Sequence, residues 1–207
     1  MPVSVLSKTS RTRRRMTDMD IIKKLWLKKD GTVLVIVDVQ ERLVPAMDEH
    51  VRQQVIANIR AIAEAARIIG LPVLATEQYP KGLGGTVPEL ASYAEGPIIQ
   101  KSSFSCCGEE SFLDALEGKK ARQILLVGME AHVCVFQTLL DLQGRGYQVH
   151  LVRDAICSRR KTDFLTALDS ARLAGATVTT TEMALFQLLQ KAGTAEFKAV
   201  SALIKDR

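Results

Sequence analysis

The chain has 207 residues, a length that suits one α/β domain with a full-sized core. Its formal net charge of +5 comes from the first 15 residues, which carry five basic residues and no acidic one, while the remaining 23 basic and 23 acidic residues balance. A neutral body without any apolar stretch long enough to span a bilayer lacks the usual signs of a nucleic-acid-binding or membrane protein, and we expect no nucleic-acid and no membrane partner.

Residues 1–15 are rich in Ser, Thr and Arg and contain no apolar run of the length that a secretory signal needs. We expect them to form a disordered basic tail before one domain over residues 16–207. Because the tail lacks acids, it resembles an organelle transit peptide. A misassigned start is the alternative that we favour, since Met16 can equally begin the chain.

Apolar residues at helical or strand spacing predict the elements that follow. A short docking helix over 18–28 precedes a buried strand over 32–37, whose apolar residues on both faces are typical of a central strand in a parallel sheet. Further strands are expected over 72–76, 98–101, 122–127, 147–152 and 176–180, and helices over 51–70, 109–116, from Cys134 onward, and over 162–175, 182–191 and 196–205. This alternation indicates an α/β fold with a six-stranded, mostly parallel sheet and helices on both faces.

Polar residues follow several of the predicted strands. Asp38 comes directly after strand 32–37, Lys101 ends strand 98–101, and Cys134 lies just past strand 122–127. Strand 147–152 is likewise followed by an acid, Asp154. Because the carboxyl ends of parallel strands open on one edge of a sheet, we expect Asp38, Lys101 and Cys134 to meet there. Two of them also have an ordinary alternative, since Asp38 can cap a turn and Lys101 can be an exposed strand-end lysine.

The long connection over 77–97 is rich in Gly and Pro and follows the strand over 72–76. Connections of this length in a compact domain are usually functional or mobile. We therefore expect it to wall or cover a pocket at the same edge of the sheet.

Cys134 is the candidate nucleophile. It stands at or near the first turn of a helix, whose unpaired N–H groups and dipole are expected to lower the pKa of the thiol. Asp38 would accept the thiol proton, and the ammonium of Lys101 would stabilise the charges that form. This combination implies acyl transfer to sulfur, followed by hydrolysis of the thioester by water.

The other cysteines, Cys106, Cys107 and Cys157, are expected to be buried and inert. The four cysteines show no CxxC spacing, which argues against a zinc site or a thioredoxin-type redox pair. Their number fits reduced thiols in a cytoplasmic compartment, although targeting to an organelle by residues 1–15 stays open.

Three stretches resemble the isochorismatase-like cysteine hydrolases: VIVDVQ around Asp38, QKSSFS around Lys101 and GMEAHVCVFQT around Cys134. The resemblance covers residues 30–190. It implies a Rossmann-like three-layer α/β/α fold in which Asp38 is the general base and acid, Lys101 its electrostatic partner and Cys134 the nucleophile. It also implies a cis peptide bond between Met129 and Glu130, which would direct the Glu130 N–H, beside that of Cys134, into an oxyanion hole.

The resemblance has one marked departure. Nicotinamidases of this family bind a metal through Asp and His residues in the loops after the second strand, whereas the loop TEQYPKGLGG contains no histidine. The loop resembles the uncharacterised hydrolase branch instead, so we expect no metal and no cofactor. Gln78 and Tyr79 are candidate pocket residues. His132 either faces the pocket or makes a polar contact at the helix start, and the second is the commoner fate of such a residue.

These observations favour a cysteine-dependent hydrolase of a small amide-type (C–N) substrate, assembled into a homo-oligomer as this family commonly is. One alternative is hydrolysis of a vinyl ether of the isochorismate type, although true isochorismatases of that kind use no cysteine nucleophile. The other is a catalytically idle member of the fold that serves as an oligomeric scaffold or binding protein.

Overall fold

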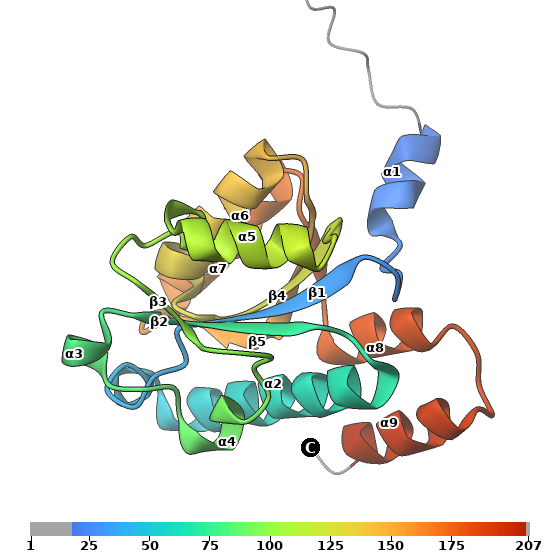
Figure 1. Ribbon diagram of the computed structural model, residues 1–207, viewed down its shortest axis with the longest axis horizontal. Coiled ribbons are helices and arrows are strands. Elements are labelled where there is room, and N and C mark those ends of the chain that lie inside the picture. Colours follow the sequence, from blue (N-terminus) through green and yellow to red (C-terminus); the bar gives the residue numbers. More distant parts are fainter. Residues whose placement is uncertain (1–17, 206–207) are drawn as a thin grey trace, which may run out of the picture.

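The computed structural model describes residues 18–205, so the predicted tail over residues 1–15 lies outside the described part of the chain. Within it, six strands form one parallel sheet in the order β3-β2-β1-β4-β5-β6 (Figure 1). The strands are β1 (Thr32–Val37), β2 (Val73–Gln78), β3 (Ile99–Lys101), β4 (Gln123–Met129), β5 (Gln148–Cys157) and β6 (Thr177–Thr179). The α-helices are α1 (Asp18–Leu25), α2 (Glu49–Ile69), α3 (Pro80–Leu83), α4 (Pro88–Ala91), α5 (Glu110–Gly118), α6 (Phe136–Gly144), α7 (Lys161–Leu173), α8 (Thr181–Leu189) and α9 (Ala195–Lys205).

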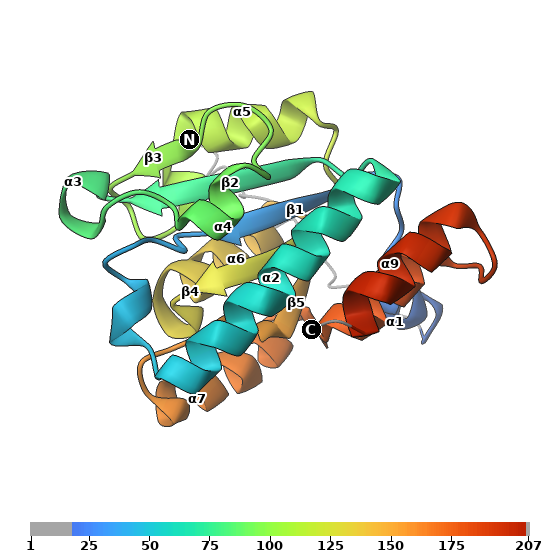
Figure 2. The same cartoon turned by 90° about the horizontal axis from the view of Figure 1, so that it is seen from below.

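Helices cover both faces of the sheet (Figures 1 and 2), which confirms the predicted three-layer architecture. Successive side chains of a strand point to opposite faces, so β1 contributes to two cores. Leu34 and Ile36 pack in the core that α2, α8 and α9 share. Val33, Val35 and Val37 pack in the core that α5, α6 and α7 share. Burial on both faces explains why this strand is apolar at every position from Val33 to Val37.

The strand order determines where a ligand site can form. β1 and β4 are neighbours in the sheet, and the chain proceeds from β1 to β2 on one side but from β4 to β5 on the other. Open α/β folds bind ligands in the crevice outside the carboxyl ends of the strands at such a switch point. Gly128 lets the two strands approach there, because its φ is +122° and a Cβ at this position would lie 2.1 Å from the Val37 carbonyl oxygen.

The fifth strand is longer than predicted, and the placement of Asp154 after its end is wrong. β5 continues to Cys157 because its pairing with β4 resumes past a register shift, with Gly128 opposite Ile156 and Met129 opposite Cys157. Asp154 therefore lies inside the strand. Its Oδ1 accepts hydrogen bonds from the Thr181 backbone N–H (2.8 Å) and hydroxyl (3.0 Å), which ties β5 to the start of α8.

The connection over 77–97 is more ordered than predicted. β2 extends to Gln78, and the two short helices α3 and α4 follow. The buried Gln40 side chain holds this segment beside β1, since its Nε2 donates to the Gln78 and Gly84 carbonyls and its Oε1 accepts from the Gln78 N–H. The connection is thus packed against the ends of β1 and β2.

The predicted helix over 18–28 forms as α1, but it ends at Leu25 and its predicted docking is wrong within the described chain. Ile21, Ile22, Leu25 and Trp26 are each between 45% and 52% exposed. In both views α1 lies at the end of the molecule opposite α3 (Figures 1 and 2). Among residues 18–205 there is no helix with the length and apolarity needed to cross a membrane.

Candidate active site

Three distant side chains meet at the carboxyl edge of the sheet. Asp38 follows β1, and Lys101 is the last residue of β3, which is separated from β1 by β2. The long lysine side chain reaches past β2, so its Nζ lies 2.7 Å from Asp38 Oδ2, and both side chains are fully buried. The predicted proximity of the carboxylate and the ammonium is confirmed.

The Asp38 carboxylate is held in one orientation. Its Oδ1 accepts a hydrogen bond of 2.7 Å from the Thr76 hydroxyl, and its backbone N–H donates to the Thr76 carbonyl at 3.2 Å. The residue has a φ of +50°, in the left-handed region that a non-glycine residue seldom adopts. Among the described residues, Oδ2 has no partner of hydrogen-bond geometry, so its close contact with Lys101 is an ion pair.

Lys101 is enclosed by oxygen acceptors. Its Nζ donates to Gln78 Oε1 at 2.6 Å and to the carbonyls of Ser103 and Phe104 at 3.2 and 3.0 Å. Burial lowers the pKa of this lysine, but the charge of Asp38, followed by those of the Cys106 and Cys134 thiols when ionised, raises it by more. The net effect is a raised pKa, so the side chain is a permanent cation at neutral pH.

Cys134 lies in a π-helical turn (Ala131–Val135) that leads from β4 into α6. β4 extends to Met129, two residues past the predicted strand end, and the turn begins before Cys134, where the helix was predicted to start. The Cys134 side chain is buried, and its Sγ lies 4.0 Å from Gln78 Oε1.

The prediction of a lowered thiol pKa is wrong. Burial, followed by the negative charge of Asp38, raises the pKa of Cys134 to about 12, although Lys101 opposes this shift. Sequence reasoning considered only the local helix start, whereas desolvation depends on the whole fold. The resting thiol is therefore protonated and needs a base to become a nucleophile.

The peptide bond between Met129 and Glu130 is cis, at the position that the resemblance implies. The Glu130 carbonyl accepts hydrogen bonds from the N–H groups of Val133 and Val135. Its buried carboxylate accepts from the backbone N–H and the Nε of Arg159, at 3.1 and 3.0 Å. The use of the Glu130 and Cys134 N–H groups as an oxyanion hole stays a prediction.

The predicted pocket residues lie in three different places. Gln78 contacts both Lys101 and Cys134. Tyr79 lies at the rim, where its N–H donates to the Lys101 carbonyl at 2.8 Å and the residue is 59% exposed. His132 instead contacts Ser158 through Nδ1 at 2.9 Å and approaches Asp163 through Nε2 at 3.8 Å. Its observed contacts are thus the polar ones that sequence analysis named as the commoner fate.

Sequence reasoning missed Thr76, and it expected Cys106 to be buried, which is confirmed, but not to lie beside the site. Thr76 pairs in register with Val37, so its hydroxyl reaches the adjacent Asp38, and a polar residue at the end of the neighbouring strand was the available signal. Cys106 Sγ lies 3.7 Å from the Thr76 hydroxyl, and burial raises its pKa to about 12. Cys106, Thr76 and Asp38 are thus linked by successive buried side-chain contacts.

The expected absence of a metal stays a prediction. No group of three or more His, Cys, Asp or Glu side chains that could hold a metal ion occurs among residues 18–205. The groups that the site presents are a thiol, a carboxylate and an ammonium, which suit proton transfer and nucleophilic attack.

Comparison with known proteins gives the same family as the motifs. The model of the isochorismatase domain matches residues 32–183. Isochorismatase domain-containing protein 2 of Danio rerio is 39% identical over 178 residues, which cover 86% of this chain and 89% of the relative. The structure of MAR1 ribonuclease from Caenorhabditis elegans is 40% identical, with a TM-score of 0.81 over 87% of this chain and 92% of that one.

A more distant structure shares the fold alone. The YcaC protein of Escherichia coli, described as an octameric hydrolase of unknown specificity, is 23% identical, with a TM-score of 0.80 over 88% of this chain and 92% of that one. The family match spans β1 to the start of α8, and it includes Asp38, Lys101 and Cys134. The chain belongs to the isochorismatase domain family.

Proposed function

We propose that this protein is a cysteine hydrolase that cleaves a small amide-type C–N bond through a thioester. The observation that carries the proposal is the fully buried Asp38–Lys101 ion pair beside the Cys134 thiol. Burying two charges is costly, and groups whose pKa values are strongly perturbed by burial and by charged neighbours cluster at functional sites. The raised pKa of Cys134 makes the adjacent carboxylate necessary, because the thiol must lose a proton as it attacks.

In the first half-reaction, Asp38 takes the proton of the Cys134 thiol while the sulfur forms a bond to the substrate carbonyl carbon. The carbonyl oxygen becomes an oxyanion, which the Glu130 and Cys134 N–H groups would stabilise. When the carbonyl reforms, the C–N bond breaks and the leaving nitrogen takes the proton from Asp38. The products of this stage are the amine and a thioester on Cys134.

In the second half-reaction, Asp38 takes a proton from a water molecule as its oxygen attacks the thioester carbon. The second oxyanion collapses, the C–S bond breaks, and the sulfur takes the proton back from Asp38. Lys101 keeps its proton throughout, because its pKa is raised. Its role is to hold the carboxylate in place and to balance the charge in each transition state.

The names of the similar structures suggest two further properties. The nematode neighbour is called a ribonuclease, but the described site offers a single buried cation, which Asp38 already pairs. Phosphodiester cleavage builds charge on phosphate oxygens, and we therefore favour the amide substrate. The E. coli neighbour is called octameric, and we propose that this chain also assembles into a homo-oligomer.

Alkylation of the thiols tests whether Cys134 is activated. Cys107 is a matched control, because both thiols are 6% exposed and the pKa of Cys107 is raised to about 11. With an amide-bearing electrophile such as iodoacetamide at pH 7.5, we expect Cys134 to be labelled at least about tenfold faster than Cys107, as read by peptide mass spectrometry. Equal rates would favour the catalytically idle alternative.

The Asp38→Asn variant tests whether Asp38 accepts the proton of Cys134 or only acts on the thiol through its charge. If Asp38 only raises the pKa of Cys134, its removal increases the thiolate fraction and labelling becomes faster. If Asp38 accepts the proton, labelling becomes slower. We expect the slower rate. A thermal melt run in parallel shows whether the variant is folded, and the double variant Asp38→Asn with Lys101→Met serves if the unpaired lysine unfolds the single one.

A substrate panel then tests the reaction itself. Small amides, ureides and carbamates, with an RNA oligonucleotide as a further arm, are incubated with the wild type, Cys134→Ala and Cys107→Ala. We expect release of an amine or ammonia by the wild type and Cys107→Ala, and a loss of at least about a thousandfold in Cys134→Ala. RNA cleavage that survives Cys134→Ala would refute the proposed mechanism.

A further inference from the structure

The helix α1 presents apolar side chains to solvent. Ile22 and Leu25, three positions apart, lie on one face of the helix, and Trp26 follows directly after Leu25, the last residue of α1. The exposed fractions of Ile22, Leu25 and Trp26 are 52%, 51% and 52%. Apolar side chains at this spacing normally pack against the core of a protein, whereas here they are about half exposed to solvent.

The body holds this helix in place at its carboxyl end. Leu27 is buried and its N–H donates to Gln187 Oε1 on α8 at 2.8 Å. The Trp26 carbonyl accepts from Gln123 Nε2 at 2.7 Å, and the Lys24 carbonyl accepts from the Thr177 hydroxyl at 3.1 Å. The stripe is thus presented outward at the amino edge of the sheet, which is the edge opposite the candidate active site.

Helix α8 extends the apolar surface. Met183 and Phe186 are 54% and 39% exposed, and they line one groove together with Trp26. We call the five residues Ile22, Leu25, Trp26, Met183 and Phe186 the apolar patch.

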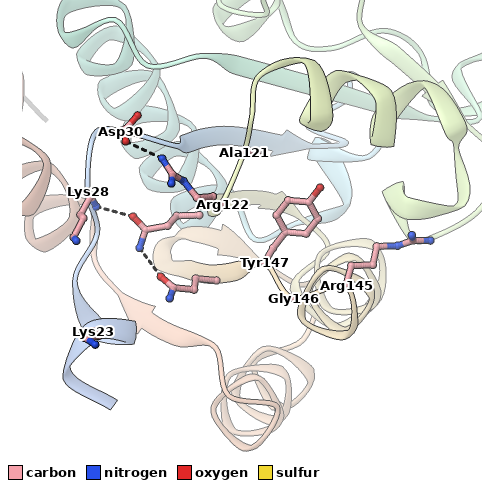
Figure 3. Close-up of a pocket in the computed structure, with 10 residues that line it drawn as sticks. Lys23, Lys28, Asp30, Ala121, Arg122, Arg145, Gly146 and Tyr147 are labelled. Carbon is pink, nitrogen blue, oxygen red and sulfur yellow. Dashed lines mark hydrogen bonds and ion pairs between the residues drawn. The ribbon is translucent and has the colours of Figure 1, made fainter. Parts of the chain in front are cut away.

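Cations border the apolar patch. A neighbouring cavity has a volume of about 700 Å³, and its lining includes Lys23, Lys28, Arg122 and Arg145. Figure 3 shows these residues. All four side chains are exposed. The one acidic residue that lines this cavity is Asp30, whose Oδ2 pairs with Arg122 Nη2 at 2.8 Å (Figure 3). The sequence before α1 adds five more basic residues.

We propose that the amino edge of this protein docks on an anionic lipid surface. The apolar patch would enter the interface, and Lys23, Lys28, Arg122 and Arg145 would contact the lipid headgroups. The charge and the apolar stripe together select this occupant: a nucleic acid would use the cations alone, and a second copy of the chain would use the apolar patch alone. The docked helix would lie in the plane of the interface, and this proposal replaces the expectation of no membrane partner.

This orientation leaves the candidate active site free. The sheet is parallel throughout, so its amino edge faces the lipid while its carboxyl edge, with Asp38, Lys101 and Cys134, faces away. The inference does not depend on the proposed hydrolase activity.

Vesicle co-sedimentation with the full chain tests the proposal. We expect binding to phosphatidylcholine vesicles that contain about 30 mol % phosphatidylserine, weak binding to pure phosphatidylcholine, and loss of binding at high salt. Lys23→Glu with Lys28→Glu should lower the partition coefficient by at least about 25-fold, or about fivefold for each lost cation. Ile22→Ser with Leu25→Ser should lower it by about tenfold or more.

Matched controls lie away from the amino edge. Arg60→Glu with Lys81→Glu makes the same change of charge, and Leu140→Ser with Leu165→Ser removes two leucines of similar exposure, 42% and 45%. Both controls should bind vesicles as the wild type does, and circular dichroism melts should show every variant folded.

Three outcomes would overturn the proposal. RNA binding that is lost in the lysine variant but kept in the Ile22 and Leu25 variant would assign the edge to a nucleic acid. Failure to bind vesicles, together with an oligomer that dissociates in the Ile22 and Leu25 variant by sedimentation velocity, would assign the patch to a second copy. Failure of the wild type to bind anionic vesicles at all would remove the proposal outright.

Discussion

The two edges of the sheet contain ion pairs of nearly equal length in opposite surroundings. At the carboxyl edge, Lys101 Nζ lies 2.7 Å from Asp38 Oδ2, with both side chains at 0% exposure. At the amino edge, Arg122 Nη2 lies 2.8 Å from Asp30 Oδ2, with side chains that are 70% and 90% exposed. Distance therefore does not distinguish the two pairs, and burial does.

The difference indicates what each edge is suited for. Buried charges at the carboxyl edge are held by oriented hydrogen bonds and can act on a substrate in a low-dielectric site. Exposed charges at the amino edge are screened and mobile, so they suit a broad contact with another surface. Three predictions test this contrast and one tests the buried His150 of β5; they run from the largest expected effect to the smallest.

Removal of Lys101 should be strongly destabilising. The Lys101→Ala variant leaves the Asp38 carboxylate buried without its cation, and we expect the free energy of unfolding to fall by about 3–5 kcal/mol. Urea denaturation followed by circular dichroism measures the loss. The double variant Asp38→Asn with Lys101→Met should recover part of it, and no recovery would show that the lysine acts through packing alone.

His150 should make the protein sensitive to acid. This side chain is 1% exposed, its Nε2 has no hydrogen-bond partner among the described residues, and burial lowers its pKa from 6.5 to about 4. Between these values the unfolded chain binds a proton that the folded chain does not, so stability falls as the pH falls. The contribution over this window is about 3 kcal/mol. Denaturation curves from pH 7 to pH 4 should show a shallower decline in His150→Gln, and identical slopes would contradict the assignment.

Thr76 should act as a positioning residue for Asp38. The Thr76→Val variant removes the 2.7 Å hydrogen bond to Asp38 Oδ1 with little change of volume. We expect kcat to fall by about tenfold with little change in KM, because the hydrogen bond that orients the carboxylate is lost. Thr76→Ser keeps the hydroxyl and should restore kcat. A change in KM alone would place Thr76 outside the catalytic machinery.

Removal of Arg122 should have the smallest effect. The Arg122→Ala variant breaks an ion pair of the same length as the buried one, but solvent screens it, and we expect a loss of less than about 1 kcal/mol. The same urea denaturation measures it. A loss as large as that of Lys101→Ala would contradict the contrast between the two edges.

Local pattern predicted much of the fold correctly. The bounds of β1, Thr32–Val37, match the prediction, because a run of five apolar residues after Thr32, set between Gly31 and Asp38, has few other interpretations. β5 was predicted too short, because Arg153 and Asp154 interrupt its apolar run and only pairing with β4 carries the strand through them. The docking of α1 failed for the converse reason, since amphipathic spacing shows which face is apolar but not whether a partner in the chain covers it.

The same limit applies to the candidate site. Asp38, Lys101 and Cys134 could be chosen from the sequence, because each lies at or just past the end of a predicted strand and parallel strands share one carboxyl edge. The pKa of Cys134 could not, because the helix start is local whereas burial and the approach of Asp38 come from distant segments.

The sequence by itself determined the alternation of strands and helices, the apolar faces and the residue types at each strand end, because these follow from periodicities of a few residues. Tertiary structure decided the strand order, the reach of Lys101 past β2 to Asp38, the hydrogen bond from Thr76 and the exposure of α1. Each of these depends on which segments pack together, and the packing of segments that are distant in the sequence cannot be predicted from a local pattern.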